Sequence, residues 1–183
     1  MMLVLALLGC NEPAPPSAPA FTPPTTSLAP AAATPAVAEA PAAATPRSMA
    51  DDAFNEAMQA HETGNPAAAK AVPRALTAYK ALGTIDTDGQ FHVALLELAA
   101  DDAAAARKTC DTILAAHPNH LFALGTAGRA AVKSGDAKAA RAYYERLVAA
   151  WDQPREALPE YEDHDRLLVV FQKEALTSLA TAP

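Results

Sequence analysis

The sequence is poor in the residue types that usually carry chemistry or cross-links. Its 183 residues include two cysteines, one tryptophan and five histidines. Cys10 and Cys110 have chemically different neighbours, so we do not expect a disulfide between them. We find no nucleophile–base pair, no paired carboxylates and no metal-ligand cluster in the sequence pattern. We therefore predict a protein that is not an enzyme and that uses no cofactor.

Clusters of positive charge are also missing. The chain has 14 Lys and Arg against 21 Asp and Glu, which gives a formal net charge of −7. Nucleic-acid binding relies on clustered Lys and Arg side chains that contact phosphates. We therefore predict that the partners of this protein do not include nucleic acid.

The N-terminal apolar run is short. Residues 1–10 read Met-Met-Leu-Val-Leu-Ala-Leu-Leu-Gly-Cys, whereas a helix that crosses a bilayer needs about 20 residues. The segment Leu7-Leu8-Gly9-Cys10 resembles the lipobox of bacterial lipoproteins. That resemblance implies a signal peptide at residues 1–9, cleavage between Gly9 and Cys10, and acylation of Cys10.

Acylation of Cys10 would hold the chain on a membrane of the bacterial cell envelope, because several acyl chains on one residue give stable anchoring. The domain that follows would face the periplasm, and the choice between inner and outer membrane stays open. Signals of this family usually carry Lys or Arg near their start, and this one does not. The alternative is an inert apolar N-terminus that ends in a free cysteine.

Residues 10–48 form a Pro/Ala-rich tract. Ten of the sixteen prolines precede residue 48, and the only charged residues between Cys10 and Ser48 are Glu12, Glu39 and Arg47. Such a composition offers little apolar surface to bury, so we predict a disordered linker. Pro13 and Pro16 give a weak match to a PxxP ligand, which is the alternative.

From Ser48 onward the sequence has the periodicity of α-helices. Ser48 and Asp51 predict the start of a first helix as a capping pair, and Asn65-Pro66 predicts the start of a second. Pro73 lies inside the second helix and is expected to kink or restart it. Further helices are predicted at residues 91–100, 103–116, 120–133, 136–150 and 167–180.

The last predicted helix has no following partner. Leu168, Phe171, Ala175, Leu176 and Leu179 recur at helical spacing and are predicted to face the body of the domain. Terminal elements of helical stacks commonly cover the exposed end of the stack. We therefore expect a C-terminal capping helix.

Residues 101–151 contain nearly the same pattern twice. Asp102, Ala106, Cys110 and Ile113 return 34 residues later as Asp136, Ala140, Tyr144 and Leu147. A helix-turn-helix unit of this period cannot bury its own apolar face and stacks on its neighbours. Cys110 takes a large position facing a neighbouring helix, so we predict a buried, inert thiol there.

This region resembles the tetratricopeptide repeat (TPR) family. In residues 121–154, Gly128 and Ala140 match the small positions and Tyr144 a large one, whereas Ala131 replaces the usual aromatic residue. The copy at 87–120 is weaker, and the one that starts near residue 50 is weaker still. The resemblance implies an all-α domain at residues 49–183, built as a short right-handed α-solenoid. Related helical-pair repeats of similar length remain an alternative.

TPR domains usually bind a protein segment in a concave groove lined by the first helix of each repeat. Carried over by position, the groove residues are Phe54, Met58, His61, Phe91, Leu95, Leu98, Phe122, Arg129 and Lys133. The three phenylalanines and two cations would suit an apolar or extended segment that ends in an acid. The alternative is that the phenylalanines pack repeat against repeat and that the two cations form a solvated face.

These features together predict a lipid-anchored scaffold that mediates protein–protein interaction in an envelope assembly. The alternative is a non-catalytic accessory or regulatory subunit of an envelope enzyme complex. Partner binding in the groove and membrane attachment through Cys10 are the interactions that both hypotheses require.

No metal site is predicted. His117 and His120 are three residues apart, but Pro118 and Asn119 between them are typical of an interhelical turn. Asp86-Thr87-Asp88-Gly89 resembles part of a calcium loop, yet the ligand positions that this register requires would fall on Thr84 and Leu95. We predict instead a turn followed by an Asp N-cap, and we interpret His61 and His92 as core or groove residues.

Overall fold

The computed structural model describes residues 43–154, 158 and 160–181. The described residues belong to one compact unit, Ala42–Pro183. Cys10, the predicted signal peptide and most of the predicted linker lie outside the described residues. No described helix is both long enough and apolar enough to cross a membrane.

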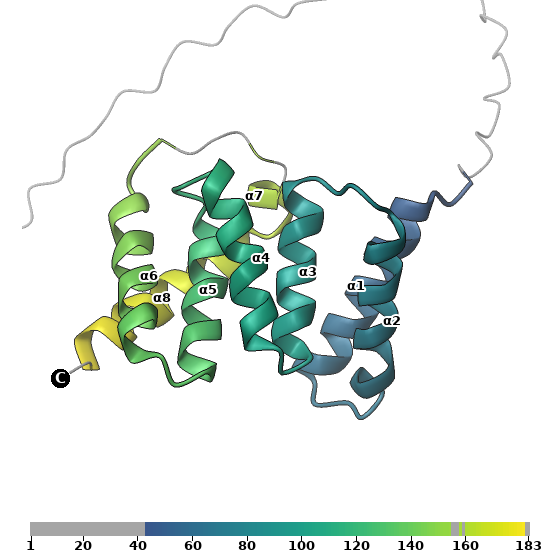
Figure 1. Ribbon diagram of the computed structural model, residues 1–183, viewed down its shortest axis with the longest axis horizontal. Coiled ribbons are helices and arrows are strands. Elements are labelled where there is room, and N and C mark those ends of the chain that lie inside the picture. The colour runs from purple at the N-terminus through teal and green to yellow at the C-terminus, as the bar shows by residue number, and fades with distance from the viewer. Residues whose placement is uncertain (1–42, 155–157, 159, 182–183) are drawn as a thin grey trace, which may run out of the picture. The chain divides into compact units, whose positions relative to one another are not determined.

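All regular elements among the described residues are α-helices, which confirms the all-α prediction (Figure 1). They are α1 (Pro46–Glu62), α2 (Ala68–Ala81), α3 (Thr87–Ala99), α4 (Ala103–Ala116), α5 (Leu121–Lys133), α6 (Ala137–Ala150), α7 (Glu160–Asp163) and α8 (Asp165–Thr181).

Side-chain caps start most of these helices. Asp86, Asp102 and Asp136 accept hydrogen bonds from backbone N–H groups three residues ahead, at the starts of α3, α4 and α6. Such bonds satisfy donors that have no partner within the helix. An Asp N-cap before α3 was predicted, and Asp86 is this cap, but the helix begins at Thr87 and not at the predicted residue 91. Helix α1 begins earlier than predicted, because Thr45 is the N-cap and Ser48 completes a capping box.

Replacing Asp102 with alanine is expected to lower the free energy of unfolding by about 1 kcal/mol, because the Ala105 N–H loses its acceptor. Asp102→Asn is the matched control, since asparagine caps a helix about as well as aspartate. Urea unfolding of the two variants measures the difference. Equal stability of both variants would contradict the capping role.

Helix α2 does not restart at Pro73, contrary to one of the two predicted outcomes. It runs from Ala68 to Ala81 with Pro73 inside it. Proline removes one backbone hydrogen bond and crowds the preceding turn. Val72 and Tyr79 on the same helix are buried, at 3% and 1% exposed. Tertiary packing of this face therefore outweighs the local cost of the proline.

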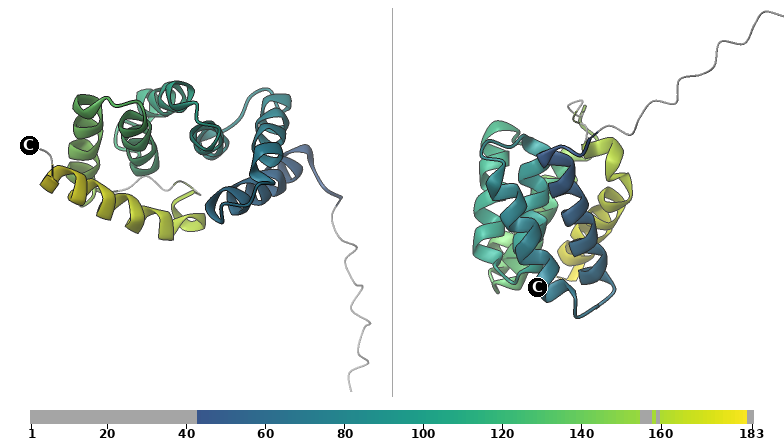
Figure 2. Two further views of the ribbon diagram at one scale, coloured as in Figure 1. Left: turned by 90° about the horizontal axis from the view of Figure 1, so that it is seen from below. Right: turned by 90° about the vertical axis from the view of Figure 1, so that its right-hand side faces the viewer.

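Successive helices pack against one another along the chain. Contacts join α1 to α2, α2 to α3, α3 to α4, α4 to α5 and α5 to α6. Viewed from below, α1 to α6 form a curved row, and α8 runs along its inner side (Figure 2, left). This inner side is the surface on which the predicted groove residues converge.

The two copies of the sequence pattern occupy equivalent places. Asp102 and Asp136 both cap a helix. Three further pairs of residues, 34 positions apart in the two copies, are also buried. They are Ala106 and Ala140, Cys110 and Tyr144, and Ile113 and Leu147. Gly128 lies directly against the Tyr144 ring, where a methyl group would overlap it. The small residue therefore sets how closely α5 and α6 approach.

Helix α8 crosses the inner side of the row instead of only covering its end. It contacts both α5 and α6, and Leu168, Phe171 and Ala175 are buried there as predicted. Leu176 is 51% exposed, so the prediction that it faces the body was wrong. The helix is tilted across two neighbours, and consequently only part of its predicted apolar face meets them.

Candidate partner-binding site

Seven of the nine predicted groove residues line two hollows on the inner side of the row. The first, which we call the α1–α8 hollow, includes Phe54, Met58, Leu95 and Arg129. The second, the α5–α8 hollow, includes His61, Leu98, Arg129 and Lys133. Arg129 and Val170 line both hollows, which therefore adjoin.

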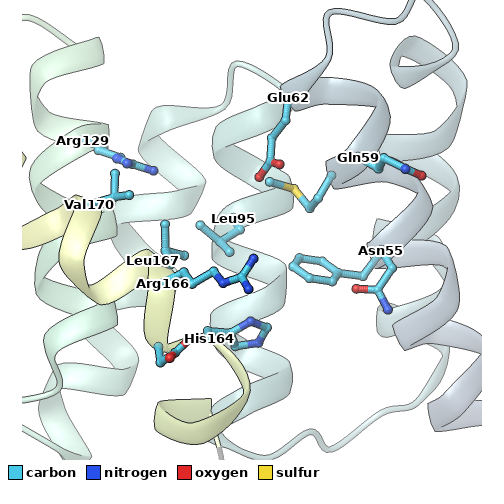
Figure 3. A pocket seen from close by; sticks show the side chains of 12 residues that line it. Asn55, Gln59, Glu62, Leu95, Arg129, His164, Arg166, Leu167 and Val170 are labelled. Carbon is cyan, nitrogen blue, oxygen red and sulfur yellow. The ribbon is translucent and has the colours of Figure 1, made fainter.

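The α1–α8 hollow has a volume of about 750 Å³. Figure 3 shows it between α1 on one side and α8 on the other, with Leu95 of α3 at the back. Its lining residues are Phe54, Asn55, Met58, Gln59, Glu62, Leu95, Arg129, His164, Asp165, Arg166, Leu167 and Val170.

This hollow combines an apolar wall with charged side chains. Leu95, Leu167 and Val170 supply apolar surface, and the Arg166 side chain extends from α8 into the space facing α1 (Figure 3). Glu62 lies at the α1 side. A few directed polar groups around apolar surface are typical of a binding pocket. The chemistry suits a segment with apolar side chains and charges of both signs.

The α5–α8 hollow is larger, at about 920 Å³. Its lining is mainly apolar and polar uncharged surface from α5 and α8 together with Lys133, Lys173 and Glu174. Val132 and Val170 in it are 56% and 44% exposed. Because Val170 lines both hollows, this exposed apolar surface continues the apolar wall of the α1–α8 hollow.

Phe91 and Phe122 do not line either hollow. Both rings are fully buried and stack on each other with centroids 4.7 Å apart. Tyr161 and Phe171 of the C-terminal segment cover Phe122, and His164 covers Phe91. The structure therefore favours the packing interpretation for these two phenylalanines, because the α7–α8 segment occupies the surface they would have offered.

The two predicted cations are engaged within the fold. Arg129 donates two hydrogen bonds to the Glu174 carboxylate on α8, at 2.7 and 2.6 Å. Its guanidinium also lies over the Phe171 ring, 4.4 Å from the centroid. Lys133 forms an ion pair with Asp101. Arg129 thus helps to hold α8 in place, as a bidentate pair with an added cation–π contact does.

A partly buried polar network joins α1, α2 and α3 near the α1–α8 hollow. Arg47 forms ion pairs with Asp51, Asp86 and Asp88. Burial opposes the charge of Arg47, yet the hydrogen bonds that it donates to Asp86 and Asp51 raise its pKa above the usual value. The arginine therefore remains charged and ties the start of α1 to the start of α3.

His92 lies at the centre of this network. It is 6% exposed, and its ring stacks on Phe54 with centroids 3.9 Å apart. Its Nδ1 atom lies 2.6 Å from the Tyr79 hydroxyl, which also hydrogen-bonds to Asp51. Burial is the main cause that lowers the pKa of His92 to about 4, and the nearby His164 also lowers it. The imidazole is therefore neutral at pH 7.

Sequence reasoning did not assign this network. Asp88 and His92 are four residues apart on one helix and therefore lie on the same face. This spacing was the sign of the network that the sequence offered. Arg47, Tyr79 and His164 reach the same point from other helices. No pattern in the linear sequence connects these positions.

Cys110 and His120 have structural surroundings. The Cys110 thiol is free and fully buried, and burial raises its pKa, which confirms the predicted burial of an unreactive thiol. His120 caps α5 and forms a buried pair with Glu160 at 2.7 Å. Neither residue lines the two hollows described above.

A scan against protein-family models and a search of curated proteins found no match to this chain. The functional argument therefore depends on the residues of the two hollows and on the resemblances in the sequence.

Proposed function

We propose that this chain is a non-catalytic, lipid-anchored scaffold of a bacterial cell envelope, and that it binds an extended protein segment in the α1–α8 hollow. The domain would be a TPR-like right-handed α-solenoid that faces the periplasm. Acylated Cys10 would provide the anchor, and residues 10–48 would hold the domain away from the membrane surface.

The observation that carries this proposal is the origin of the hollow's lining. Phe54 and Met58 come from α1, Leu95 from α3 and Arg129 from α5. These are the first helices of three consecutive helix pairs. In the TPR family it is the first helix of each pair that lines the peptide-binding groove.

The lining also matches the chemistry of a peptide segment. An extended chain presents side chains alternately to two sides, so an apolar wall can bind one set while charged residues contact the other. Met58 is suited to such a wall, because its flexible thioether adapts to different side chains. Glu62, Arg129 and Arg166 supply the charges around it.

A photoreactive side chain at Met58 tests the site in intact cells. We expect it to cross-link to one envelope protein, and the same group at Lys108 to give no such product. Lys108 is exposed on α4 and lines neither hollow. Cross-linking to the same protein from both positions would show that the α1–α8 hollow is not the binding site.

With that partner purified, Met58→Glu is expected to weaken binding at least about tenfold, which corresponds to about 1.4 kcal/mol. The reason is that a carboxylate would lose hydration against the apolar wall. Lys108→Glu changes charge at an exposed position that lines neither hollow and should leave the Kd unchanged. Cys10→Ser should release the chain from membranes without altering this Kd, which separates anchoring from recognition.

A further inference from the structure

Three potential metal ligands converge where α3 meets the start of α8. The Nε2 atoms of His92 and His164 lie 2.9 Å apart. The Oδ1 atom of Asp88 lies 3.4 Å from the first and 3.9 Å from the second. A point equidistant from these atoms is about 2.0 Å from each, which is the length of zinc–nitrogen and zinc–oxygen bonds in proteins.

The two Nε2 atoms are within hydrogen-bond distance of each other, so one of them carries a proton that a bound metal ion would displace. Asp88 Oδ2 pairs with Arg47, whereas Asp88 Oδ1 is buried and has no hydrogen-bond partner among the described residues. A buried carboxylate oxygen without a donor is costly, so its presence calls for a cation or a proton close by.

The surroundings of His92 leave the lone pair of its Nε2 atom directed at this point. The Tyr79 hydroxyl has one proton, and Asp51 as a carboxylate can only accept it. His92 Nδ1 therefore carries the proton that is donated to the Tyr79 oxygen, over 2.6 Å. A metal-binding histidine usually donates its other N–H to such a partner, and this contact sets the tautomer and orients the ring.

We propose that Asp88, His92 and His164 bind one divalent transition-metal ion, with Zn²⁺ as the ion that fits best. Two imidazoles and one carboxylate are a common ligand set for such ions.

The ion would join two parts of the domain that are distant in sequence. Asp88 and His92 belong to α3, and His164 lies between α7 and α8. His164 also lines the α1–α8 hollow. Bound metal would therefore hold the C-terminal segment over Phe91, and three protein ligands would leave a position for water or for a group of a partner.

Titration of the purified, untagged full chain with Zn²⁺ after chelator treatment tests the site. We expect one Zn²⁺ per chain, a Kd raised at least about tenfold by Asp88→Asn or His164→Gln, and no change with His61→Gln. His164 is partly exposed, so we expect the fold to tolerate its replacement by glutamine, whereas His61 is an exposed histidine that lines the α5–α8 hollow. Mg²⁺ and Ca²⁺ prefer all-oxygen ligand sets and should not compete.

A second measurement separates specific binding from surface association. Zn²⁺ should raise the Tm of the wild-type chain and of His61→Gln, but not that of His164→Gln, because only a site in the folded state stabilises it. Tyr79→Phe keeps all three ligands but removes the contact that orients His92, and we expect it to weaken Zn²⁺ binding about tenfold. Absence of stoichiometric binding, or equal affinity in wild type and His164→Gln, would overturn the proposal.

Discussion

Replacing Phe171 with alanine is expected to lower the free energy of unfolding by about 3–5 kcal/mol. Phe171 is fully buried where α8 crosses α5, and its ring contacts Phe122, Gly125 and Arg129. The alanine would lose this apolar burial and leave a cavity between the two helices. Urea unfolding measures the loss. Val169→Ala on the same helix is the control, because Val169 is 64% exposed and should change stability by about 0.5 kcal/mol or less.

Gly125 gives this prediction a matched test. A methyl group on Gly125 would overlap the Phe171 ring, so Gly125→Ala alone should cost about 1–3 kcal/mol by forcing α8 outward. In the Phe171→Ala background the space is free, and the same change should cost much less. Hydrogen exchange of the α8 amides should rise in both single variants. Additive losses in the double variant would mean that Gly125 and Phe171 do not determine how α8 packs.

Replacing Glu160 with alanine is expected to cost about 1–3 kcal/mol. The Glu160 carboxylate accepts a hydrogen bond from His120 Nε2 at 2.7 Å, and both side chains are almost completely buried. His120 Nδ1 accepts from the Ala123 N–H, so the Nε2 atom carries the proton that the carboxylate accepts. Removal of Glu160 would take this buried hydrogen bond away.

The control for this prediction is Glu162→Ala, two residues along the same short helix, because Glu162 is exposed and should contribute little. Thermal unfolding of the two variants gives the comparison. A double-mutant cycle of Glu160→Ala with His120→Ala should show a coupling of at least about 1 kcal/mol. Equal stability of Glu160→Ala and Glu162→Ala would contradict the role of the buried pair in holding α7 on α5.

The helices of this domain could be predicted well because their signals are local. Residues 103–116 were predicted as a helix and α4 has these bounds, with Asp102 as the cap. Apolar spacing of 3.6 residues and a capping aspartate act within one or two turns. Two details of these helices were not predicted correctly. Thr45 was missed as the cap of α1, and Pro73 was given too much weight because its cost is offset by contacts with another helix.

The candidate site could be predicted only in part. The helix positions that face inward follow from periodicity, and seven of the nine predicted residues line the two hollows. Phe91 and Phe122 face inward as well, but they are covered by a segment about 40 or more residues further along. Periodicity tells which side of a helix is apolar, and it does not tell which element covers that side.

The amino-acid sequence by itself determined the all-helical class, the boundaries of helices such as α4 and the equivalence of the two copies at a 34-residue offset, because each of these follows from neighbours within a few turns. Only the tertiary structure decided that α8 lies along the inner side and that His164 meets Asp88 and His92. An amphipathic helix can bury its apolar face against several surfaces of similar character. The fit of Phe171 against Gly125 and the pairing of Arg129 with Glu174 select one of them, and these contacts exist only once the helices have packed.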